Sequence, residues 1–397
     1  MKQICDNDKC FGCALCSSVC PNGAINMNDE TGFYRPVINS NKCNGCNLCV
    51  KFCAANNSVN SHGNIAASTY AACSLDDERH FNCTSGGLAT EISNVFIDRL
   101  NGVVAGCAWN ENMTAYHRMV TEPCDLKYIS KSKYVYSDMS ECYGEITKYV
   151  KEGRKILFIG VPCQVFAVKK YFEYKKYDTE KLYTIDLLCH GGASPKVLKE
   201  HLKHVTNGKS VDNVTFRGGE YDCSFTAYLN DKVIYRKMQF MDEYFYSFMK
   251  RIIYSPCCYE CPFANDKRIG DLTLGDFWGL GDDFREFDRT KGVNVLMVNN
   301  SEAGKELLEL VKDKISIFPR EHSEAVSGND TLREPTQKPA GYEDFMRICN
   351  TDGLHTAIKR AFGNELNKNY RKYIIKEKIK KVMPAGLLSV YRKLKGR

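Results

Sequence analysis

Residues 10–21 read Cys10-Phe-Gly-Cys13-Ala-Leu-Cys16-Ser-Ser-Val-Cys20-Pro21, and residues 43–53 repeat the pattern as Cys43-Asn-Gly-Cys46-Asn-Leu-Cys49-Val-Lys-Phe-Cys53. In both runs the cysteines are separated by two, two and three residues. Three thiolates at this spacing can wrap one face of an iron–sulfur cubane, while the fourth cysteine begins a helix that crosses to a neighbouring cluster. The two runs therefore predict a module that holds two [4Fe–4S] clusters.

This spacing is that of the bacterial two-cluster ferredoxins, in which the fourth cysteine of each run ligates the other cluster. We expect one cluster on Cys10, Cys13, Cys16 and Cys53, and a second on Cys43, Cys46, Cys49 and Cys20. One cysteine pair could be half of a zinc site, but two full sets about thirty residues apart disfavour zinc. Residues 24–27 and 34–37 alternate like two strands between the runs. Residues 1–60 are thus expected to form a ferredoxin-like domain, with Cys5 as an ordinary residue near a cluster.

Length and cysteine content limit the remaining possibilities. A chain of 397 residues, 43% of them hydrophobic, can form two or three globular units. It has no uninterrupted apolar run long enough to span a membrane, and Met1–Cys5 lacks the features of a signal peptide, so we expect a cytoplasmic protein. Cytosolic thiols stay reduced, so the 21 cysteines indicate metal binding or redox chemistry rather than disulfides.

The positive charge is concentrated at the C-terminal end. Lys359–Arg397 holds 13 Lys and Arg against two Glu, a local excess of +11 within a total of +7, which leaves −4 for the rest of the chain. A basic tail on a mildly acidic body argues against a nucleic-acid-binding enzyme.

The middle of the chain alternates between helix and strand patterns. Leu88–Leu100 has the apolar spacing of a helix, and residues 103–108, 155–159 and 183–188 read as buried strands. The last two strands lead into turns that carry Cys163 and Cys189, at the position where α/β proteins place ligands. Farther on, Cys258 and Cys261 have the spacing of two ligands of one metal centre. From spacing alone, a third metal site and ordinary buried cysteines remain equally good readings.

An ordered set of short motifs resembles the β-subunit family of coenzyme F420-reducing hydrogenases and dehydrogenases, in the form that carries an N-terminal ferredoxin. The motifs span roughly residues 70–300 and follow the family's order: Cys83-Thr84-Ser85-Gly86-Gly87, Ser132-Lys133-Tyr134-Val135, Val161-Pro162-Cys163-Gln164, Cys189-His190-Gly191, Ser194-Pro195, Cys258-Tyr259-Glu260-Cys261 and Gly275-Asp276-Phe277-Trp278-Gly279. The resemblance implies a mixed α/β domain over residues 61–320 that binds FAD and a further [4Fe–4S] cluster. Its implied ligands are Cys163, Cys189, Cys258 and Cys261.

The same resemblance suggests where the flavin binds. Thr84, Ser85, Gly86 and Gly87 precede a helix, whose N-terminal amides can meet a phosphate, although such a sequence is also an ordinary helix-entry turn. The further candidates for the flavin pocket come from two other motifs: Ser132, Lys133, Tyr134, Asp276 and Trp278. Lys133 could instead be a solvated surface lysine, and Asp276 and Trp278 could be core residues.

His190 is the candidate catalytic residue, as a proton donor to a substrate. A histidine in such a turn more often satisfies a local hydrogen bond.

Residues 321–397 are expected to form a helical, basic C-terminal extension. Ala357–Val382 has helical spacing, Met383–Gly386 interrupts it, and Leu387–Leu394 resumes it. A basic amphipathic segment can lie on the anionic inner face of a membrane, while packing of its apolar stripe on the body is the commoner outcome.

The combined expectation is an α+β and α/β iron–sulfur flavoprotein oxidoreductase. Electrons would pass between the ferredoxin-type clusters, a third cluster and FAD, and then to or from a small organic two-electron substrate. That substrate could be a deazaflavin coenzyme or a biosynthetic intermediate, such as one in cell-surface polysaccharide assembly. The redox partner would be a ferredoxin, the deazaflavin coenzyme or a reductase subunit. The alternative is a non-catalytic electron-transfer subunit of a larger complex.

Overall fold

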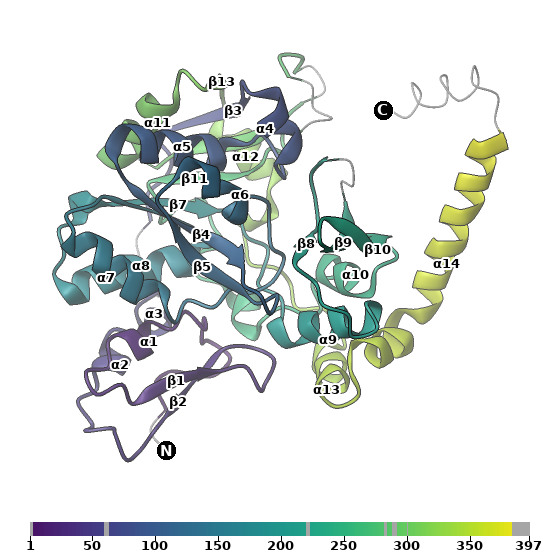
Figure 1. Ribbon diagram of the computed structural model, residues 1–397, viewed down its shortest axis with the longest axis horizontal. Coiled ribbons are helices and arrows are strands. Elements are labelled where there is room, and N and C mark those ends of the chain that lie inside the picture. The colour runs from purple at the N-terminus through teal and green to yellow at the C-terminus, as the bar shows by residue number, and fades with distance from the viewer. Residues whose placement is uncertain are drawn as a thin grey trace.

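The chain folds into an N-terminal cysteine-rich module, a central eight-stranded sheet covered by helices, and a smaller three-stranded unit from which the last helix projects (Figure 1). The computed structural model describes residues 3–58, 63–219, 223–281, 284–287, 292–299 and 301–382. None of the helices in these ranges is both long and apolar enough to cross a membrane.

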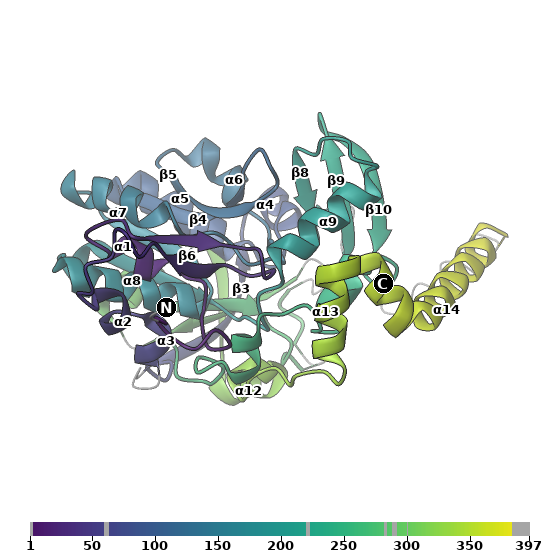
Figure 2. The same cartoon turned by 90° about the horizontal axis from the view of Figure 1, so that it is seen from below.

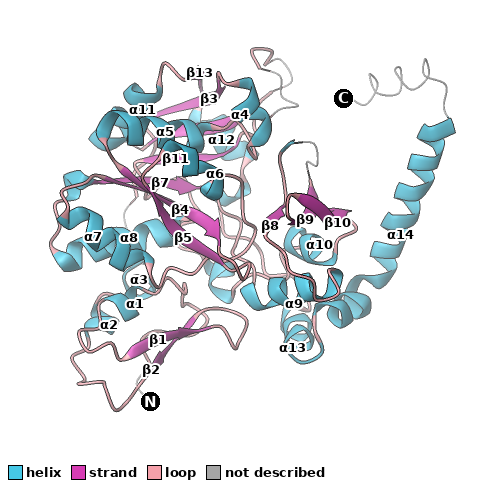
Figure 3. Ribbon diagram, in the orientation of Figure 1, coloured by secondary structure: helices cyan, strands magenta, loops and turns pink. Residues whose placement is uncertain are grey.

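The module (residues 3–58) has the two strands that the sequence predicts, β1 (Ile25–Asn28) and β2 (Arg35–Ile38), which pair antiparallel with Ile25 opposite Ile38 (Figure 3). Each cysteine run bends through a residue of left-handed backbone, Ala14 or Asn47, into a one-turn helix. The short helices are α1 (Leu15–Ser18), α2 (Leu48–Lys51) and α3 (Ala54–Asn57). This internal repeat of loop and helix follows the repeat in the sequence.

The central sheet has the strand order β13-β3-β12-β11-β7-β6-β4-β5. Its strands are β3 (Ser68–Ser74), β4 (Val103–Trp109), β5 (Ala115–Val120), β6 (Ile156–Gly160), β7 (Leu182–Leu187), β11 (Leu272–Asp276), β12 (Asn294–Val298) and β13 (Ile315–Arg320). Strands β11, β7, β6 and β4 are parallel neighbours. Strand β3 runs in the same direction, because β12 is antiparallel to both β3 and β11. Five strands therefore end at the same edge, where open α/β sheets bind ligands.

Helices cover both faces of this sheet. The predicted helix over Leu88–Leu100 is α5, and it packs with α11 (Glu302–Val311) over one face, in a core that includes Val104, Leu157 and Ile185. Helices α7 (Cys142–Lys151) and α8 (Pro162–Lys175) cover the other face. Shorter helices connect these elements: α4 (Asp77–Asn82), α6 (Leu126–Ile129) and α12 (His322–Gly328). Single 3₁₀ turns are η2 (Pro123–Asp125), η3 (Thr179–Lys181), η5 (Pro256–Glu260) and η7 (Asp330–Leu332). The helix and the three buried strands predicted for the middle of the chain are confirmed.

The smaller unit is a feature that the sequence did not predict. Its sheet, β10-β9-β8, packs with four helices around a core rich in phenylalanine and tyrosine. Its elements are β8 (Asn213–Thr215), β9 (Ser224–Leu229), β10 (Lys232–Met238), α9 (Pro195–Val205), α10 (Glu243–Met249), α13 (Tyr342–Asp352) and α14 (Leu354–Val382).

Helix α14 begins on this smaller unit and ends away from it. Leu354, Ala357 and Ile358 are buried in the core, whereas Tyr370 and Ile375 are exposed. Figures 1 and 2 both show the helix extending outward past α13. The interruption and second helical segment predicted after Val382 lie outside the described residues.

Candidate functional site

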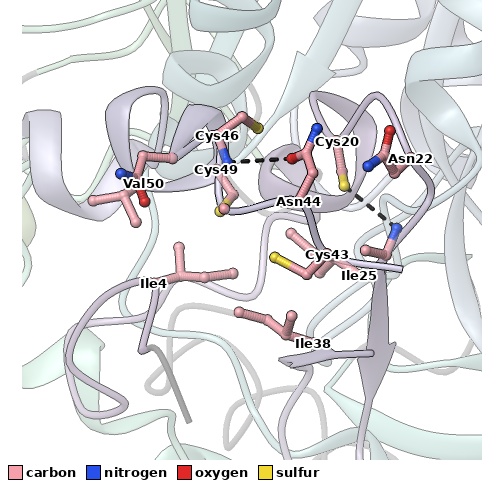
Figure 4. A pocket seen from close by; sticks show the side chains of 13 residues that line it. Ile4, Cys20, Asn22, Ile25, Ile38, Cys43, Asn44, Cys46, Cys49 and Val50 are labelled. Carbon is pink, nitrogen blue, oxygen red and sulfur yellow. Dashed lines mark hydrogen bonds between the residues drawn. The ribbon is translucent and has the colours of Figure 1, made fainter. Parts of the chain in front are cut away.

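The outer cysteine set, Cys20, Cys43, Cys46 and Cys49, surrounds a cavity of about 450 Å³, counting its open mouth. These are the four cysteines that the sequence assigned to the second cluster. Figure 4 shows Cys20, Cys46 and Cys49 toward the top of the view and Cys43 below them, near Ile25 and Ile38. Four sulfurs around one space fit a cubane cluster, in the way that the spacing predicted.

Backbone amides support this set. The amide of Ala24 donates to Cys20 Sγ over 3.3 Å, and the side chain of Asn44 accepts a bond from the amide of Cys46 over 3.2 Å (Figure 4). Such hydrogen bonds hold the loop open around the ligands and stabilise negative charge on sulfur.

The inner cysteine set, Cys10, Cys13, Cys16 and Cys53, is buried, with each residue only 7–8% exposed. The amide of Gly12 donates to Cys10 Sγ over 3.4 Å. Burial raises the pKa of the Cys13 and Cys16 thiols, so their thiolates require a stabilising partner such as iron. The Cys5 thiol interacts with both Cys10 and Cys53, which makes it a fifth sulfur at this set.

The third cysteine set comes from three separate segments. Cys163 follows β6 at the start of α8, Cys189 follows β7, and Cys258 and Cys261 belong to η5 and the residue after it. Because β6 and β7 are parallel neighbours, Cys163 and Cys189 lie at the same edge of the sheet. Burial raises the pKa of the Cys163, Cys189 and Cys261 thiols, while a hydrogen bond with Cys257, followed by burial, raises that of Cys258. The charge of Cys189 further raises the pKa of Cys163, Cys258 and Cys261.

The described cysteines do not form a compact single-ion site. Sulfurs around one zinc ion lie about 3.8 Å apart, since each Zn–S bond is about 2.3 Å. Within the described residues, no three cysteine sulfurs lie within 4.8 Å of one another. Cys257 is adjacent to the set, and its thiol donates to Ser255 Oγ over 3.3 Å.

Two hydrogen bonds reach this third set from neighbouring loops. The phenol oxygen of Tyr136 lies 3.3 Å from Cys163 Sγ, and the amide of Gly192 donates to Cys258 Sγ over 3.4 Å. Burial raises the pKa of Tyr136 well above its ordinary value, so its phenol keeps its proton. The sequence reasoning missed Tyr136, although it follows the Ser132–Val135 motif directly.

A buried ion pair connects two of the segments that carry the third cysteine set. Arg268 Nη2 lies 2.9 Å from Asp186 Oδ1, and Arg268 Nη1 donates to the carbonyl of Phe263 over 3.1 Å. The guanidinium charge lowers the pKa of Cys189 and Cys261 against the larger effect of burial. Arg268 therefore ties the β7 segment to the segment after Cys261. The sequence held a signal for this ion pair: Asp186 lies in a strand predicted to be buried, and a buried carboxylate requires a partner such as Arg268.

The Thr84–Gly87 motif lies at the same carboxyl edge, between β3 and α5. Thr84 Oγ1 accepts a bond from the amide of Ser132 over 2.9 Å, so the structure joins two of the motifs. Gly86 lies so close to the backbone of β3 that a Cβ at this position would be only 2.6 Å from the carbonyl oxygen of Ala72. Ser85 is 7% exposed, and its hydroxyl has no hydrogen-bond partner in the described part of the chain. An orphaned buried hydroxyl beside a helix N-terminus fits a bound phosphate group.

Lys133 differs from a solvated surface lysine. Its ammonium group donates to the carbonyl of Ser130 over 2.6 Å and to two further backbone carbonyls over 3.3 Å. Burial lowers the pKa of Lys133 to about 8. Tyr134 instead belongs to the aromatic core of the smaller unit, where its ring stacks on Phe248.

The remaining predicted residues are spread along the same edge. Asp276, at the end of β11, forms an ion pair with Arg217 at 2.5 Å, whereas Trp278 is 63% exposed. His190 Nδ1 lies 3.1 Å from Asp330 Oδ1. Burial lowers the pKa of His190, which favours the neutral imidazole at neutral pH and makes it a better proton acceptor than donor.

One further group of metal-type ligands lies away from these motifs. Ligand atoms of His204, Glu243 and His355 are within 4.8 Å of one another, and His355 Nδ1 lies 2.7 Å from Glu243 Oε1. The histidines are exposed, and the His355–Glu243 contact already joins α14 to α10 without an ion.

Two family models match separate parts of this chain. Residues 9–57 match the 4Fe-4S dicluster domain, and residues 153–322 match the C-terminal region of the coenzyme F420 hydrogenase/dehydrogenase beta subunit. A coenzyme F420-dependent sulfite reductase from Methanocaldococcus jannaschii is 25% identical over 226 residues, which are 53% of this chain and 35% of that protein. This chain therefore spans about a third of the relative's length.

A solved structure of the F420-reducing [NiFe] hydrogenase complex from Methanosarcina barkeri superposes with a TM-score of 0.48 and 16% identity, over 75% of this chain and 92% of that chain. The two matches confirm the resemblance read from the motifs: residues 153–322 are similar to the C-terminal region of the coenzyme F420 hydrogenase/dehydrogenase beta subunit, and the N-terminal residues 9–57 are similar to the 4Fe–4S dicluster domain.

Proposed function

We propose that this protein is an iron–sulfur flavoprotein oxidoreductase with three [4Fe–4S] clusters in series and an FAD beyond them. The observation that carries the proposal is the succession of three cysteine sets, from the exposed outer set through the buried inner set to the third set at the sheet edge. A chain of one-electron centres is useful when a distant donor must feed a buried acceptor.

Direct packing joins the inner and third sets. Phe11, next to Cys10, lies 5.7 Å from the ring of Phe263, which follows Cys261 by two residues. Arg35 of β2 donates to Ser255 Oγ over 3.3 Å, next to η5. The module thus contacts the body through residues that neighbour the two cysteine sets in the sequence.

The proposed flavin site is the carboxyl edge of the sheet beside the third set. The Ser85 hydroxyl at the N-terminal end of α5 would hold a phosphate, and Lys133 would contribute positive charge. Such a flavin converts one-electron into two-electron transfer, so two electrons arriving singly could leave as a hydride. His190 would accept or return a proton beside it, since its neutral form dominates at neutral pH.

The proposed two-electron partner is a deazaflavin coenzyme or another small organic molecule. A non-catalytic subunit remains the second candidate, and one observation favours it: Cys43 and Cys46 of the outer set are exposed, as docking to a protein redox partner requires. A cytoplasmic location, with contact to the membrane through the basic tail, also stays a prediction.

The test is anaerobic purification followed by iron, sulfide and flavin counts. Three cubane clusters require about twelve iron per chain, and about eight would overturn the third cluster. Cys258→Ala should lose about four iron and keep the ferredoxin-type signals. The matched control is Cys257→Ala, which should keep all the iron; loss of iron from the control alone would overturn the ligand set. Bound FAD and oxidation of a reduced deazaflavin would support the enzyme over the subunit.

A further inference from the structure

We propose that Tyr136 is a positioning residue that donates a hydrogen bond to the iron-bound sulfur of Cys163 and so raises the reduction potential of the third cluster. This inference rests on the proposed function, since it requires the third cluster. Tyr136 belongs to none of the motifs that identified the chain.

The geometry fixes which atom donates. The phenol oxygen of Tyr136 lies 3.3 Å from Cys163 Sγ, and the residue is 7% exposed. A thiol and a phenol can each donate, but a cysteine that ligates iron has lost its proton. The phenol must therefore be the donor once the cluster is bound.

The ring is held between the loops of two cysteine sets. A Cβ at Gly192, in the turn after Cys189, would lie 2.1 Å from Tyr136 Cδ2, and a Cβ at Gly12, in the inner set, would lie 3.7 Å from Tyr136 Cε1. The Tyr136 amide also donates to the carbonyl of Ala193 over 3.0 Å. Ring and backbone are thus fixed on both sides, so the phenol cannot turn away from the sulfur without displacing a loop.

The direction of the effect follows from charge. Reduction adds one negative charge to a cluster, and a hydrogen bond to a ligand sulfur stabilises the more negative state. Removing the donor should make the third cluster harder to reduce. The inner and outer clusters should keep their potentials, because within the described part of the chain the Tyr136 hydroxyl bonds to a sulfur of the third set and to none of theirs.

The experiment is a redox titration of the anaerobic holoprotein followed by electron paramagnetic resonance, with Tyr136→Phe against wild type. The variant removes only the hydroxyl group. We expect its third-cluster midpoint potential to shift to more negative values, with unchanged iron content and unchanged potentials of the other two clusters. The matched control is Tyr143→Phe, another buried tyrosine near the clusters, whose hydroxyl donates to the carbonyl of Cys13 over 2.7 Å instead of to a sulfur. The control should leave the third-cluster potential unchanged.

The outcomes separate the two proposals. An unchanged third-cluster potential in Tyr136→Phe with full iron would overturn the role of Tyr136 and leave the proposed function intact. About eight iron in the wild type would overturn the third cluster itself. If Tyr136→Phe fails to assemble the third cluster, site-specific incorporation of fluorotyrosine at position 136 decides, because a more acidic phenol is a stronger donor. The third-cluster potential should then become more positive, and no movement would overturn the inference.

Discussion

Asp186 is a charged residue inside a fully buried strand, and it is stable there because every acceptor position is used. Its carboxylate accepts bonds from Arg268, from the hydroxyl of Thr273 over 2.7 Å, and from the amides of Ile269 and Gly270 over 3.0 and 2.8 Å. A buried charge without such partners would cost several kcal/mol. The polar network therefore holds together the turn that leads from the third cysteine set into β11.

Replacing Arg268 by Met should destabilise the protein, because Asp186 would be left as a buried, uncompensated charge. We expect the free energy of unfolding to fall by about 3–5 kcal/mol, measured by urea denaturation of the anaerobic protein. The matched control is Arg99→Ala, which breaks the exposed pair with Asp313 and should cause no measurable change. Equal stability of Arg268→Met and wild type would show that the pair is dispensable.

His117 makes the stability depend on pH in a defined window. Its ring is buried in β5, stacks on Phe158 and lies 3.2 Å from the carbonyl of Ile159. Burial lowers the pKa of His117 to about 4, below the value of about 6.5 in the unfolded chain. Between these values the unfolded state binds a proton that the folded state does not, so stability falls as the pH falls through this range.

His117→Gln should therefore flatten the pH dependence. Between pH 7 and pH 5, the unfolding free energy of the wild type should fall by about 2 kcal/mol more than that of the variant. This follows because pH 5 lies about 1.5 pH units below the pKa of histidine in the unfolded chain, and each unit corresponds to about 1.4 kcal/mol. Urea denaturation at the two pH values measures this difference. If wild type and variant lose the same amount, His117 is not the responsible group.

At the scale of elements, the polar turn before α5 combines a helix start with an unused donor. Gly87 has a positive φ of 83°, and Asn294 Oδ1 accepts the bond from the amide of Leu88, while the Ser85 hydroxyl stays without a partner in the described residues. An ordinary helix-entry turn would use its serine as a cap. The turn therefore supports phosphate binding more strongly than its sequence alone did.

Ser85→Ala should weaken flavin binding and leave the clusters intact. Loss of one hydrogen bond to a phosphate corresponds to about 1.5–3 kcal/mol, or roughly a tenfold or larger rise in the dissociation constant of FAD. The matched control is Ser93→Ala within α5, where the hydroxyl donates to the carbonyl of Ala89 over 2.6 Å. Flavin and iron counts on both variants test the assignment, and equal flavin content in the two would exclude Ser85 as a ligand.

The elements that could be predicted were those with strong local patterns. The helix over Leu88–Leu100 and the strands at β4, β6 and β7 follow from apolar periodicity. The sheet β10-β9-β8 could not be predicted in this way, because β10 is mostly exposed and half-buried and lacks a clean alternation. The convergence of Cys163 and Cys189 depended on β6 and β7 being neighbours, which is a property of topology rather than of either segment.

At the scale of the whole molecule, the outer and inner cysteine sets differ in their exposure to solvent. Cys43 and Cys46 are exposed at the far end of the module, whereas the inner set is buried between the module and helices α7 and α8. The ferredoxin spacing predicts two ligand sets, but it gives no indication of which set is exposed to solvent. That difference arises from docking against residues more than a hundred positions away, such as Tyr143, which donates to the carbonyl of Cys13.

The exposure gradient predicts an order of iron loss. When the anaerobic holoprotein is treated with a mild iron chelator, about four of the expected twelve iron should leave in a fast first phase, from the outer set. The reason is access, since a chelator can reach the open cavity of the outer set, which of the three sets is the one with exposed cysteines, Cys43 and Cys46. Iron release followed by absorbance measures the phases. Cys43→Ala should lack the fast phase, and a fast phase of the same size in that variant would place the accessible cluster elsewhere.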